Sequence, residues 1–479
     1  MTRRGVGIGV GGRSGSGWRS DMGFSRGRRS PWLLSDMVAD VSLSGIGGTG
    51  TGRSTQHGIV GGMNKDAESP SDQPEHSWIV VADSGFLPPR GGGEQEHLGF
   101  VRAVYRAGWL ALLVVPTDKE LDLDAYTKVI GRTPLVPTTR RMSLLRLAHP
   151  RYPYVVASRP YPRHLADRIR ALAPHATGVV TFSYKSRLIG EKIATGLSLP
   201  MVLRQHNREG EYHRSLASGM HGPRKLVMTW EAWRIERDER NFDRSPAVTA
   251  VADISADDAA KRRAAGARRV LHVPPFAFDP DLAAGSIAAR GRGTESRVLF
   301  LGALDVVTNQ SALEWFTTQV WPLVLGELPT AVLDVVGSRP SAELRRQVGD
   351  VPNTELHADV PDVSPYLERA GVAVNPAVTG SGVNIKLVEY LQSGVPVVST
   401  ALATRGLDLR AGVDLEVHDE PVGFAAAVVA MLRDPERAAR VASSGRDRVS
   451  ELLNPSRNLD LMAKAFAARA GAGAASTEN

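Results

Sequence analysis

Residues 380–400 read GSGVNIKLVEYLQSGVPVVST and decide the fold of the second half of the chain. A short apolar run at Val372–Asn375, of the kind that forms a buried strand, precedes them. Apolar residues then recur at helical spacing and predict one buried side of a helix: Ile385, Val388 and Leu391. Gly394 ends that helix, and Val395–Val398 predict the next strand. The glycines at its start therefore lie in a strand-to-helix loop at the carboxyl edge of a parallel sheet, where such sheets bind ligands.

Two charged residues, Lys386 and Glu389, stand on the helix just after this loop. A helix N-terminus, capped by Ser381 or Asn384, offers unpaired N–H groups to a phosphate, and Lys386 adds a full positive charge. Glu389, one turn later on roughly the same face, suits hydrogen bonds from a ribose diol. The pair therefore fits a nucleotide diphosphate. The same spacing is also common in surface ion pairs that stabilise a helix by only about 0.2–0.5 kcal/mol, so spacing alone leaves both interpretations open.

Strands alternate with helices along most of the chain, which implies parallel sheets covered on both faces. The predicted strands are Trp78–Ala82, Trp109–Val115, Gly178–Thr181, Met201–Arg204, Val248–Val251, Arg297–Leu301, Ala331–Val336, Val372–Asn375 and Val395–Val398. The predicted helices are 98–107, 163–173, 185–195, 226–244, a helix capped by Ser255, 311–324, 341–348, 423–433 and a stretch within 435–470. The expected fold class is α/β, with two Rossmann-like, doubly wound domains that face a cleft.

The chain of 479 residues divides by composition. We expect a disordered tail rich in Gly, Ser and Arg (1–75), an N-terminal Rossmann-like domain (76–275), a linker (276–296), a C-terminal Rossmann-like domain (297–440) and C-terminal helices (441–470) that pack back on the N-terminal domain. The tail cannot bury enough apolar surface to offset the entropy of ordering. An overlong gene model is the alternative for this region, because Met63 stands shortly before the first strand.

Charge and composition exclude several function classes. Most of the net charge of +7 comes from residues 1–30, where seven arginines face one acidic residue. A tail of this kind is usually solvated, so we expect no specific nucleic acid as a partner. The chain has no cysteine, which excludes disulfides, a thiolate nucleophile and cysteine-ligated metal. No apolar run reaches the length of a membrane span or a signal peptide, so we expect a cytoplasmic protein.

Three stretches of the N-terminal half carry polar or small residues next to predicted strands. Gly91, Gly92 and Gly93 follow the first strand and precede a helix that we expect to begin at Glu94, although a flexible surface loop would look the same. The stretch 203–213, LRQHNREGEYH, begins at the carboxyl end of another strand. Residues 122–124, DLD, lie in a polar segment that we interpret as a solvated loop, and no cluster has the spacing of metal ligands.

The segment 369–407 resembles the nucleotide-sugar site of GT-B glycosyltransferases, specifically the large retaining family called group 1 or family 4. The resemblance extends more weakly over 78–470. It implies that Glu389 matches the second of the family's two acidic residues and holds the ribose, while Lys386 falls inside the motif as in members with a GxGxxxK variant. The donor-binding residues that it implies are Gly302, Asn309, Gly380, Ser381, Gly382, Val383, Asn384, Lys386 and Glu389.

The resemblance also gives roles to the N-terminal stretches. Gly91, Gly92 and Gly93 would bring backbone amides to the donor phosphate and the acceptor. Residues 206–209 resemble the H-N-x-E segment of a subset of the family, in which His206 would reach the transferred sugar. Glu209 is the candidate base, and Arg204, Asn207 or Glu209 would hold the donor or the acceptor.

Two positions depart from the family pattern. Ser381 stands where the family has its first glutamate, which binds hydroxyls of the donor sugar. Main-chain amides at 381–383 would substitute for it. The loop LGALDVVTNQ (301–310) lacks the arginine and lysine that grip the diphosphate in the family. The phosphate charge would then rest on Lys386, the helix dipole and an arginine from elsewhere.

The resemblance implies an enzyme that moves a sugar from a nucleotide-diphosphate sugar to a hydroxyl of a glycan, glycolipid or small molecule, with retention and without an obligatory cofactor or metal. The expected partners are that donor and a glycan or lipid-linked acceptor, with peripheral contact at the inner membrane face. A non-catalytic nucleotide-sugar-binding or scaffold subunit of a polysaccharide assembly complex is the main alternative, because of the two departures. Nucleic-acid binding through 1–30 and a sugar phosphorylase are weaker alternatives.

Overall fold

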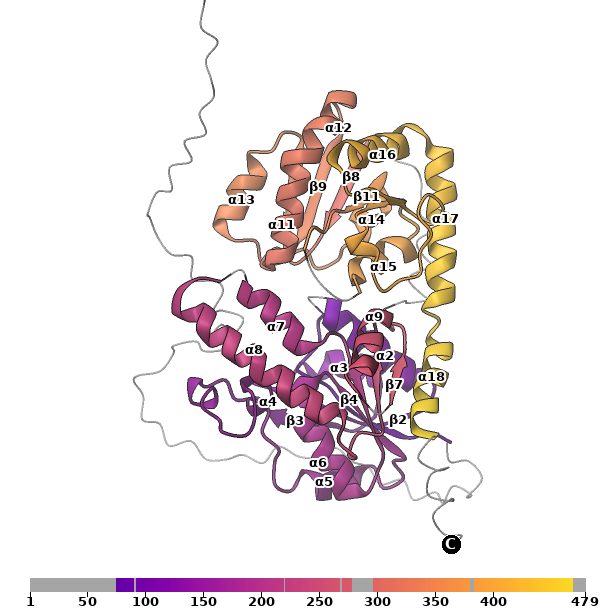
Figure 1. Ribbon diagram of the computed structural model, residues 1–479. Coiled ribbons are helices and arrows are strands. Elements are labelled where there is room, and N and C mark those ends of the chain that lie inside the picture. The colour runs from indigo at the N-terminus through magenta and orange to yellow at the C-terminus, as the bar shows by residue number, and fades with distance from the viewer. Residues whose placement is uncertain are drawn as a thin grey trace, which may run out of the picture. The chain divides into compact units, whose positions relative to one another are not determined.

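The computed structural model describes residues 75–89, 92–218, 220–267, 269–277, 296–379 and 383–467 (Figure 1). The expected tail, except Glu75, and most of the expected linker lie outside these residues. The described chain forms two parallel sheets, one of seven strands in the order β3-β2-β1-β4-β5-β6-β7 and one of six in the order β10-β9-β8-β11-β12-β13. The predicted class, two Rossmann-like doubly wound sheets, is therefore confirmed.

The first sheet lies in the N-terminal half. Its strands are β1 (Trp78–Val81), β2 (Leu110–Thr117), β3 (Leu135–Thr139), β4 (Gly178–Phe182), β5 (Met201–Gln205), β6 (Ala250–Asp253) and β7 (Val270–His272). The helices of this half are α2 (Gly92–Arg106), α3 (Leu123–Ile130), α4 (Tyr154–Ala157), α5 (Leu165–Leu172), α6 (Arg187–Leu197), α7 (Glu209–Ser218), α8 (Gly222–Asp243) and α9 (Ala256–Ala264). Short 3-10 turns, η1 (Leu144–Arg146) and η2 (Tyr184–Ser186), complete it.

The second sheet follows the linker. Its strands are β8 (Arg297–Leu301), β9 (Val332–Gly337), β10 (Thr354–Ala358), β11 (Val372–Asn375), β12 (Val397–Ser399) and β13 (Glu416–Val417). The helices are α11 (Val307–Trp315), α12 (Trp321–Glu327), α13 (Ala342–Gly349), α14 (Ser364–Arg369), α15 (Ile385–Gln392), α16 (Pro421–Arg433), α17 (Pro435–Leu452) and α18 (Pro455–Ala467). The helix predicted at 311–324 is continuous, with a π-helical segment at Phe316–Val320 between its α-helical parts, α11 and α12.

Both faces of each sheet are covered, as an uninterrupted apolar strand sequence requires. In β1, Trp78 and Val80 belong to the cluster that contains residues of α2 and α18, whereas Ile79 and Val81 belong to the cluster that contains residues of α5 and α6. All four residues of β1 are buried. Each sheet thus forms the middle layer of a helix–sheet–helix sandwich, and its loops gather at the carboxyl edge.

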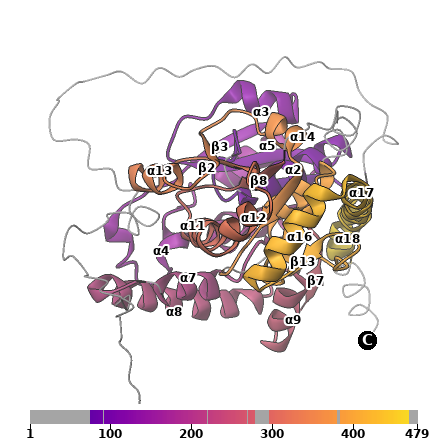
Figure 2. The same cartoon turned by 90° about the horizontal axis from the view of Figure 1, so that it is seen from above.

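The C-terminal helices contact both sheets. Gly445 of α17 lies against Leu391 of α15, whereas Met462 of α18 is fully buried in the cluster of the first sheet. Asn458 Nδ2 donates hydrogen bonds to the carbonyl oxygens of Pro274 (3.3 Å) and Pro275 (3.2 Å). The two places where the chain passes from one sheet to the other therefore touch, and α17 and α18 follow one another in both views (Figures 1 and 2).

Local signals for helix ends were partly correct. Ser255 caps α9 as predicted, and its hydroxyl accepts a hydrogen bond from the Asp258 amide at 3.4 Å. Asp122, interpreted as part of a solvated loop, instead caps α3 by accepting a hydrogen bond from the Ala125 amide at 2.9 Å, which is the usual role of an aspartate at this position. None of the helices that the structure describes is both long and apolar enough to cross a membrane.

Candidate nucleotide-sugar site

Three of the expected donor-binding residues meet at the carboxyl edge of the second sheet. Lys386 Nζ, in the first turn of α15, donates a hydrogen bond of 2.6 Å to Asn309 Oδ1 in α11. Asn309 Nδ2 donates in turn to the carbonyl of Ala303 at 2.9 Å. A Cβ on Gly302 would lie 3.2 Å from the Asn309 amide and 3.4 Å from Lys386 Nζ, so glycine leaves room for this amine. The amine is therefore held beside the end of β8.

Lys386 and Glu389 influence each other's ionisation. Removal from water lowers the pKa of Lys386 to about 8, although the Glu389 carboxylate opposes the shift. Removal from water raises the pKa of Glu389 to about 7, although the Lys386 charge opposes the shift. Both residues therefore titrate near neutral pH, which is common for groups in a binding cleft that is filled by a charged ligand.

The segment that leads into α15 is held from two directions. Asn384 occupies the N-cap position, but its side chain makes no capping bond and its Nδ2 donates to Asn375 Oδ1 at 3.2 Å. Val383 packs against Gly406, where a Cβ would come within 2.7 Å of Val383 Cγ2. Gly380, Ser381 and Gly382 lie outside the described residues. The Asn384 side chain therefore does not cap the first turn of α15, in which the Leu387 N–H donates to the Asn384 carbonyl oxygen at 3.1 Å.

The glycines after β1 begin a helix earlier than predicted. α2 starts at Gly92 instead of Glu94, and Gly91 lies outside the described residues. A Cβ on Gly92 would lie 3.1 Å from Ile385 Cβ, so the first residues of α2 and α15 are in contact. Ile385 is accordingly only half-buried and faces α2, whereas the sequence placed it on the buried side of α15. Two helix N-termini, one from each sheet, thus lie next to each other.

His206 lies next to the place where α2 and α15 meet. It follows β5, and a Cβ on Gly93 would lie 3.6 Å from its Nδ1. Its ring packs edge-to-face against His97 with centroids 5.0 Å apart. Burial first, and then the neighbouring His97, hold the pKa of His206 well below its usual value. His206 Nε2 is buried without a hydrogen-bond partner among the described residues, so this neutral imidazole keeps one unused polar nitrogen.

A cluster of charged side chains lies close to His206. Lys185 Nζ stands 3.4 Å from Glu209 Oε1 and 3.9 Å from Asp83 Oδ2. Glu209 is the main cause that raises the pKa of Lys185, against burial. Burial opposes ionisation of Asp83, but the charges of His97 and Lys185 hold the pKa of its carboxyl below the usual range. Glu209, the predicted base, is therefore engaged with Lys185 and is 3% exposed.

Sequence reasoning did not single out Asp83, His97 or Lys185. Asp83 follows β1 and Lys185 follows β4, and these two strands are neighbours in the first sheet. A search for charged residues directly after buried strands would have found both, because neighbouring parallel strands end at the same edge.

Arg204 makes structural contacts inside the first half of the chain. Its guanidinium is fully buried and donates from Nε to Glu96 Oε1 at 2.8 Å. It also donates to the carbonyl oxygens of Val273 (3.1 Å) and Pro274 (2.9 Å). Arg204 therefore ties β5 to α2 and to the chain that leaves the first sheet.

Arg339 supplies a cation near the loop after β8. The residue follows β9, the neighbour of β8, and has φ of 56°, in the left-handed region. Its Nε lies 2.8 Å from Asp305 Oδ2, and its backbone N–H donates to Asp359 Oδ1 at 2.7 Å. Asp305 thus orients an arginine at the edge where the sequence suggested that a cation from elsewhere was needed.

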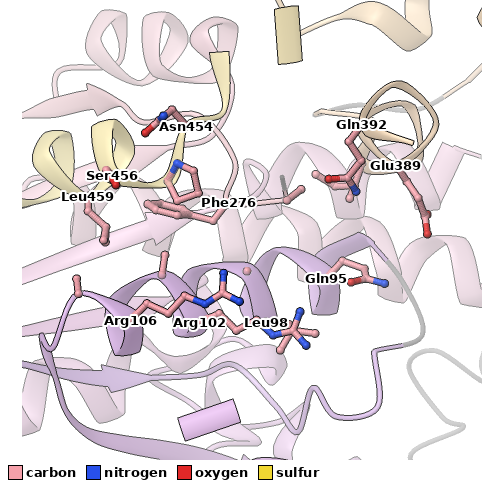
Figure 3. A pocket seen from close by; sticks show the side chains of 16 residues that line it. Gln95, Leu98, Arg102, Arg106, Phe276, Glu389, Gln392, Asn454, Ser456 and Leu459 are labelled. Carbon is pink, nitrogen blue, oxygen red and sulfur yellow. The ribbon is translucent and has the colours of Figure 1, made fainter. Parts of the chain in front are cut away.

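Glu389 also lines a pocket of about 560 Å³ between α2, α15 and the start of α18 (Figure 3). Glu389 and Gln392 enter it from α15, and Gln95, Arg102 and Arg106 enter it from α2. Phe276, Leu98 and Leu459 supply its apolar wall. The pocket is therefore open to a ligand that carries both polar and apolar groups.

One group in the described residues has ligand atoms close enough for a metal ion: Asp334, Glu355 and His357. Asp334 Oδ1 already accepts hydrogen bonds from Arg297 (3.1 Å) and Arg369 (2.6 Å). Two arginines therefore neutralise this carboxylate, and the group is a structural ion cluster. Asp122 and Asp124 do not belong to any such group among the described residues.

Comparisons with known proteins show which sequences and folds this chain is similar to. Residues 295–434 match the family model described as "Glycosyl transferases group 1". A 240-residue segment is 24% identical to an uncharacterised 44.6 kDa protein in the cps region of Klebsiella pneumoniae. That match covers 48% of this chain and 58% of the relative, so the chain spans little more than half of the relative's length.

Two solved structures show the same fold. HepE of Anabaena, in complex with UDP and glucose, is 13% identical, with a TM-score of 0.56 over 82% of this chain and 100% of that chain. Sucrose-phosphate synthase of Thermosynechococcus elongatus is 16% identical, with a TM-score of 0.59 over 83% of this chain and 100% of that chain. The family match over residues 295–434 and this shared fold confirm the predicted resemblance to group 1 glycosyltransferases of the GT-B fold.

Proposed function

We propose that this protein is a glycosyltransferase that moves a sugar from a nucleotide-diphosphate sugar to a hydroxyl of a glycan, glycolipid or small molecule. The observation that carries the proposal is the meeting of Lys386, Asn309 and Gly302 beside the start of α15, where the Asn384 side chain makes no capping bond. This arrangement offers an amine and the N-terminus of a helix to a diphosphate. The C-terminal domain (297–440) takes the donor, and the N-terminal domain (76–275) takes the acceptor.

The donor is held from both sides of the α15 start. Lys386, the first-turn N–H groups and Arg339 bind the diphosphate, while Gly302 and Asn309 position Lys386. Glu389 accepts hydrogen bonds from the ribose. Because HepE has been solved with UDP-glucose, a uridine-diphosphate sugar is the first donor to test.

The transfer step needs few groups from the protein. The bond between the anomeric carbon and the diphosphate oxygen breaks while the acceptor oxygen bonds to that carbon. The acceptor proton passes to an oxygen of the leaving diphosphate, as the resemblance implies for a retaining front-face reaction. Lys386 and the helix N-terminus stabilise the charge that grows on the leaving group. His206 contacts the transferred sugar through Nε2, and Gly92 and Gly93 bring backbone amides close to it.

Donor turnover tests this proposal. The full chain is incubated with UDP-, GDP- and ADP-sugars with and without candidate acceptors, and nucleotide release and the anomeric configuration of the product are followed by NMR. We expect one donor to be consumed, with the anomeric configuration kept, and Lys386→Ala to abolish the reaction. Inversion of the anomeric centre would contradict the retaining mechanism, and consumption of the donor only when inorganic phosphate is supplied would indicate a phosphorylase.

A binding subunit without transferase activity is the second candidate. Ser381 at the position of the family's first glutamate favours it, because the usual contact to the donor sugar is then missing. Glu209, the candidate base, is engaged with Lys185, which also favours this candidate. Tight nucleotide-sugar binding with no turnover of any donor would support this candidate against the transferase.

A further inference from the structure

Helix α8 (Gly222–Asp243) has an inverted distribution of apolar and acidic residues. Its outer side exposes four large apolar residues: Leu226 (73% exposed), Val227 (44%), Trp230 (47%) and Trp233 (50%). These are the two most exposed tryptophans of the described chain, and the residues at 226, 230 and 233 follow the spacing of one helix face. The helix lies at the periphery beside α7 in both views (Figures 1 and 2).

The acidic residues of α8 lie on the opposite side and are all paired with arginines. The pairs are Glu231 with Arg234, Glu236 with Arg214, Asp238 with Arg187, and both Glu239 and Asp243 with Arg262. The exposed side carries cations instead: Arg224, Lys225, Arg237 and Arg240. A surface helix of a soluble protein normally shows the reverse arrangement, with apolar residues inside and acids outside. The exposed side of α8 thus combines tryptophan, leucine and positive charge.

Two stretches of sequence that flank this face are rich in positive charge. Arg234 donates to the carbonyl oxygens of Leu147 (2.9 Å), His149 (2.5 Å) and Tyr152 (2.7 Å), which holds the 147–152 segment against α8. Leu145 in this region is 85% exposed. Residues 125–166 contain eight lysines and arginines and no Asp or Glu, and residues 212–230 contain three and none. The apolar face is thus flanked mainly by positive charge, and the partly exposed Glu211 of α7 is paired with Arg208 and Lys261.

We propose that the exposed face of α8, with Leu145 beside it, docks on an anionic lipid bilayer. Tryptophan prefers the interface between water and hydrocarbon, and leucine and valine enter the acyl boundary beneath it. Arginine and lysine around them attract anionic headgroups, and the pairing of the nearby acidic residues with cations limits the repulsion that such headgroups would meet. The charge pattern selects a bilayer over a second copy of this chain, because two such faces would repel each other.

The docking face is one helix away from the candidate site. α8 packs on α7, whose first residue is Glu209. A Cβ on Gly210 would collide with Glu236 of α8, and Glu239 Oε2 accepts a hydrogen bond from the Gly210 amide at 3.3 Å. A bilayer on the far side of α8 therefore places the N-terminal half of the site near the lipid headgroups. The docking itself needs no sugar transfer, so its test is independent of the proposed function.

Vesicle flotation with the full chain tests the proposal. The vesicles contain phosphatidylcholine alone or phosphatidylcholine mixed with phosphatidylglycerol. We expect binding to the mixed vesicles, and a loss of about tenfold or more in Trp230→Ser/Trp233→Ser and in Arg224→Glu/Lys225→Glu. A control variant, Leu123→Ser/Val422→Ser, removes two apolar residues of similar exposure elsewhere (60% and 72%) and should bind like the wild type.

A conservative variant separates docking from a folding defect. Trp230→Phe/Trp233→Phe keeps apolar side chains, so it should still float with the mixed vesicles. Quenching of tryptophan fluorescence by brominated lipid should be strong in the wild type and mostly lost in this variant. Unchanged flotation of the serine and glutamate variants would overturn the proposal and assign the binding to another part of the chain. No binding of the wild type, or a dimer that dissociates in the serine variant, would also overturn it.

Discussion

His206 is one of the residues with a buried polar atom that finds no partner among the described residues. Leaving a buried polar nitrogen without a partner disfavours folding by about 1–3 kcal/mol. Its Nε2 is in that state among the described residues, and its depressed pKa keeps the ring neutral at physiological pH. A sugar hydroxyl that donates to or accepts from this nitrogen would remove the penalty on binding. Such a gain made in the transition state accelerates transfer.

Replacement of His206 tests this role. We expect His206→Ala to lower the rate of sugar transfer by about 10²–10³, as loss of one oriented hydrogen bond does, while nucleotide affinity stays unchanged. His175→Ala, at an exposed position, is the matched control and should behave like the wild type. A rate for His206→Ala within twofold of the wild type would place the histidine outside the reacting centre.

The pH dependence of nucleotide binding follows from the two shifted groups of α15. Lys386 loses its proton as pH rises through about 8, which removes the charge that attracts the diphosphate. Glu389 gains a proton as pH falls through about 7, which removes an acceptor for the ribose. Affinity should therefore be highest between these values and fall on both sides. Lys386→Arg should abolish the decline on the alkaline side, because a guanidinium stays charged. A flat profile in wild-type calorimetry would separate both residues from the nucleotide.

At the scale of elements, the central strands could be predicted and the edge strands could not. The sequence analysis missed β3, β7, β10 and β13, and each of them is an edge strand of its sheet. Their sequences are short, mixed and partly exposed, for example TELHA in β10. Central strands are buried on both faces and read as uninterrupted apolar runs, whereas an edge strand has fewer neighbours and tolerates polar residues.

The site was predictable where a motif stood on one element. Lys386 and Glu389 were found from the α15 segment because loop, helix and strand signals agree there. Asn309 and Gly302 came from the resemblance, and their contact with Lys386 is a product of the sheet order. Asp83 and Lys185 carry only a weak local signal, since each is a single charged residue shortly after a strand. That the two lie close together becomes evident only when the order of β1 and β4 is known.

Helix α2 approaches the chain that leaves the first sheet at Gly99. A Cβ there would lie 1.6 Å from the Phe276 carbonyl oxygen, and backbone cannot move away as a side chain would. Gly99→Ala should therefore lower the free energy of unfolding by about 1–3 kcal/mol or more. Gly326→Ala in α12, where no atom lies within 4 Å, should instead raise it by up to about 1 kcal/mol. Denaturant unfolding of both variants measures the difference, and equal stabilities would contradict the close approach.

At the scale of the whole molecule, the residues proposed to bind the donor lie mainly around the second sheet. The cluster of His206, Lys185, Glu209 and Asp83 belongs to the first sheet. The chain passes between the sheets at 274–277 and at 452–455, and Asn458 joins these passages through the carbonyls of Pro274 and Pro275. Glu96 strengthens the first passage by accepting a hydrogen bond from the Phe276 amide at 2.6 Å. The proposed site therefore depends on contacts between segments far apart in sequence, which local patterns do not encode.

Calorimetric titration with UDP, GDP and ADP tests the central claim most directly. The proteins are the wild type, Lys386→Ala, Glu389→Ala and, as a control, Glu436→Ala/Arg440→Ala, which removes an exposed ion pair of α17. We predict that one nucleotide binds the wild type and the control equally, and that each α15 variant weakens it by about 10- to 100-fold, the value of a charged hydrogen bond. Binding that survives in both α15 variants, or no binding of any nucleotide to the wild type, would contradict a donor site at Lys386 and Glu389.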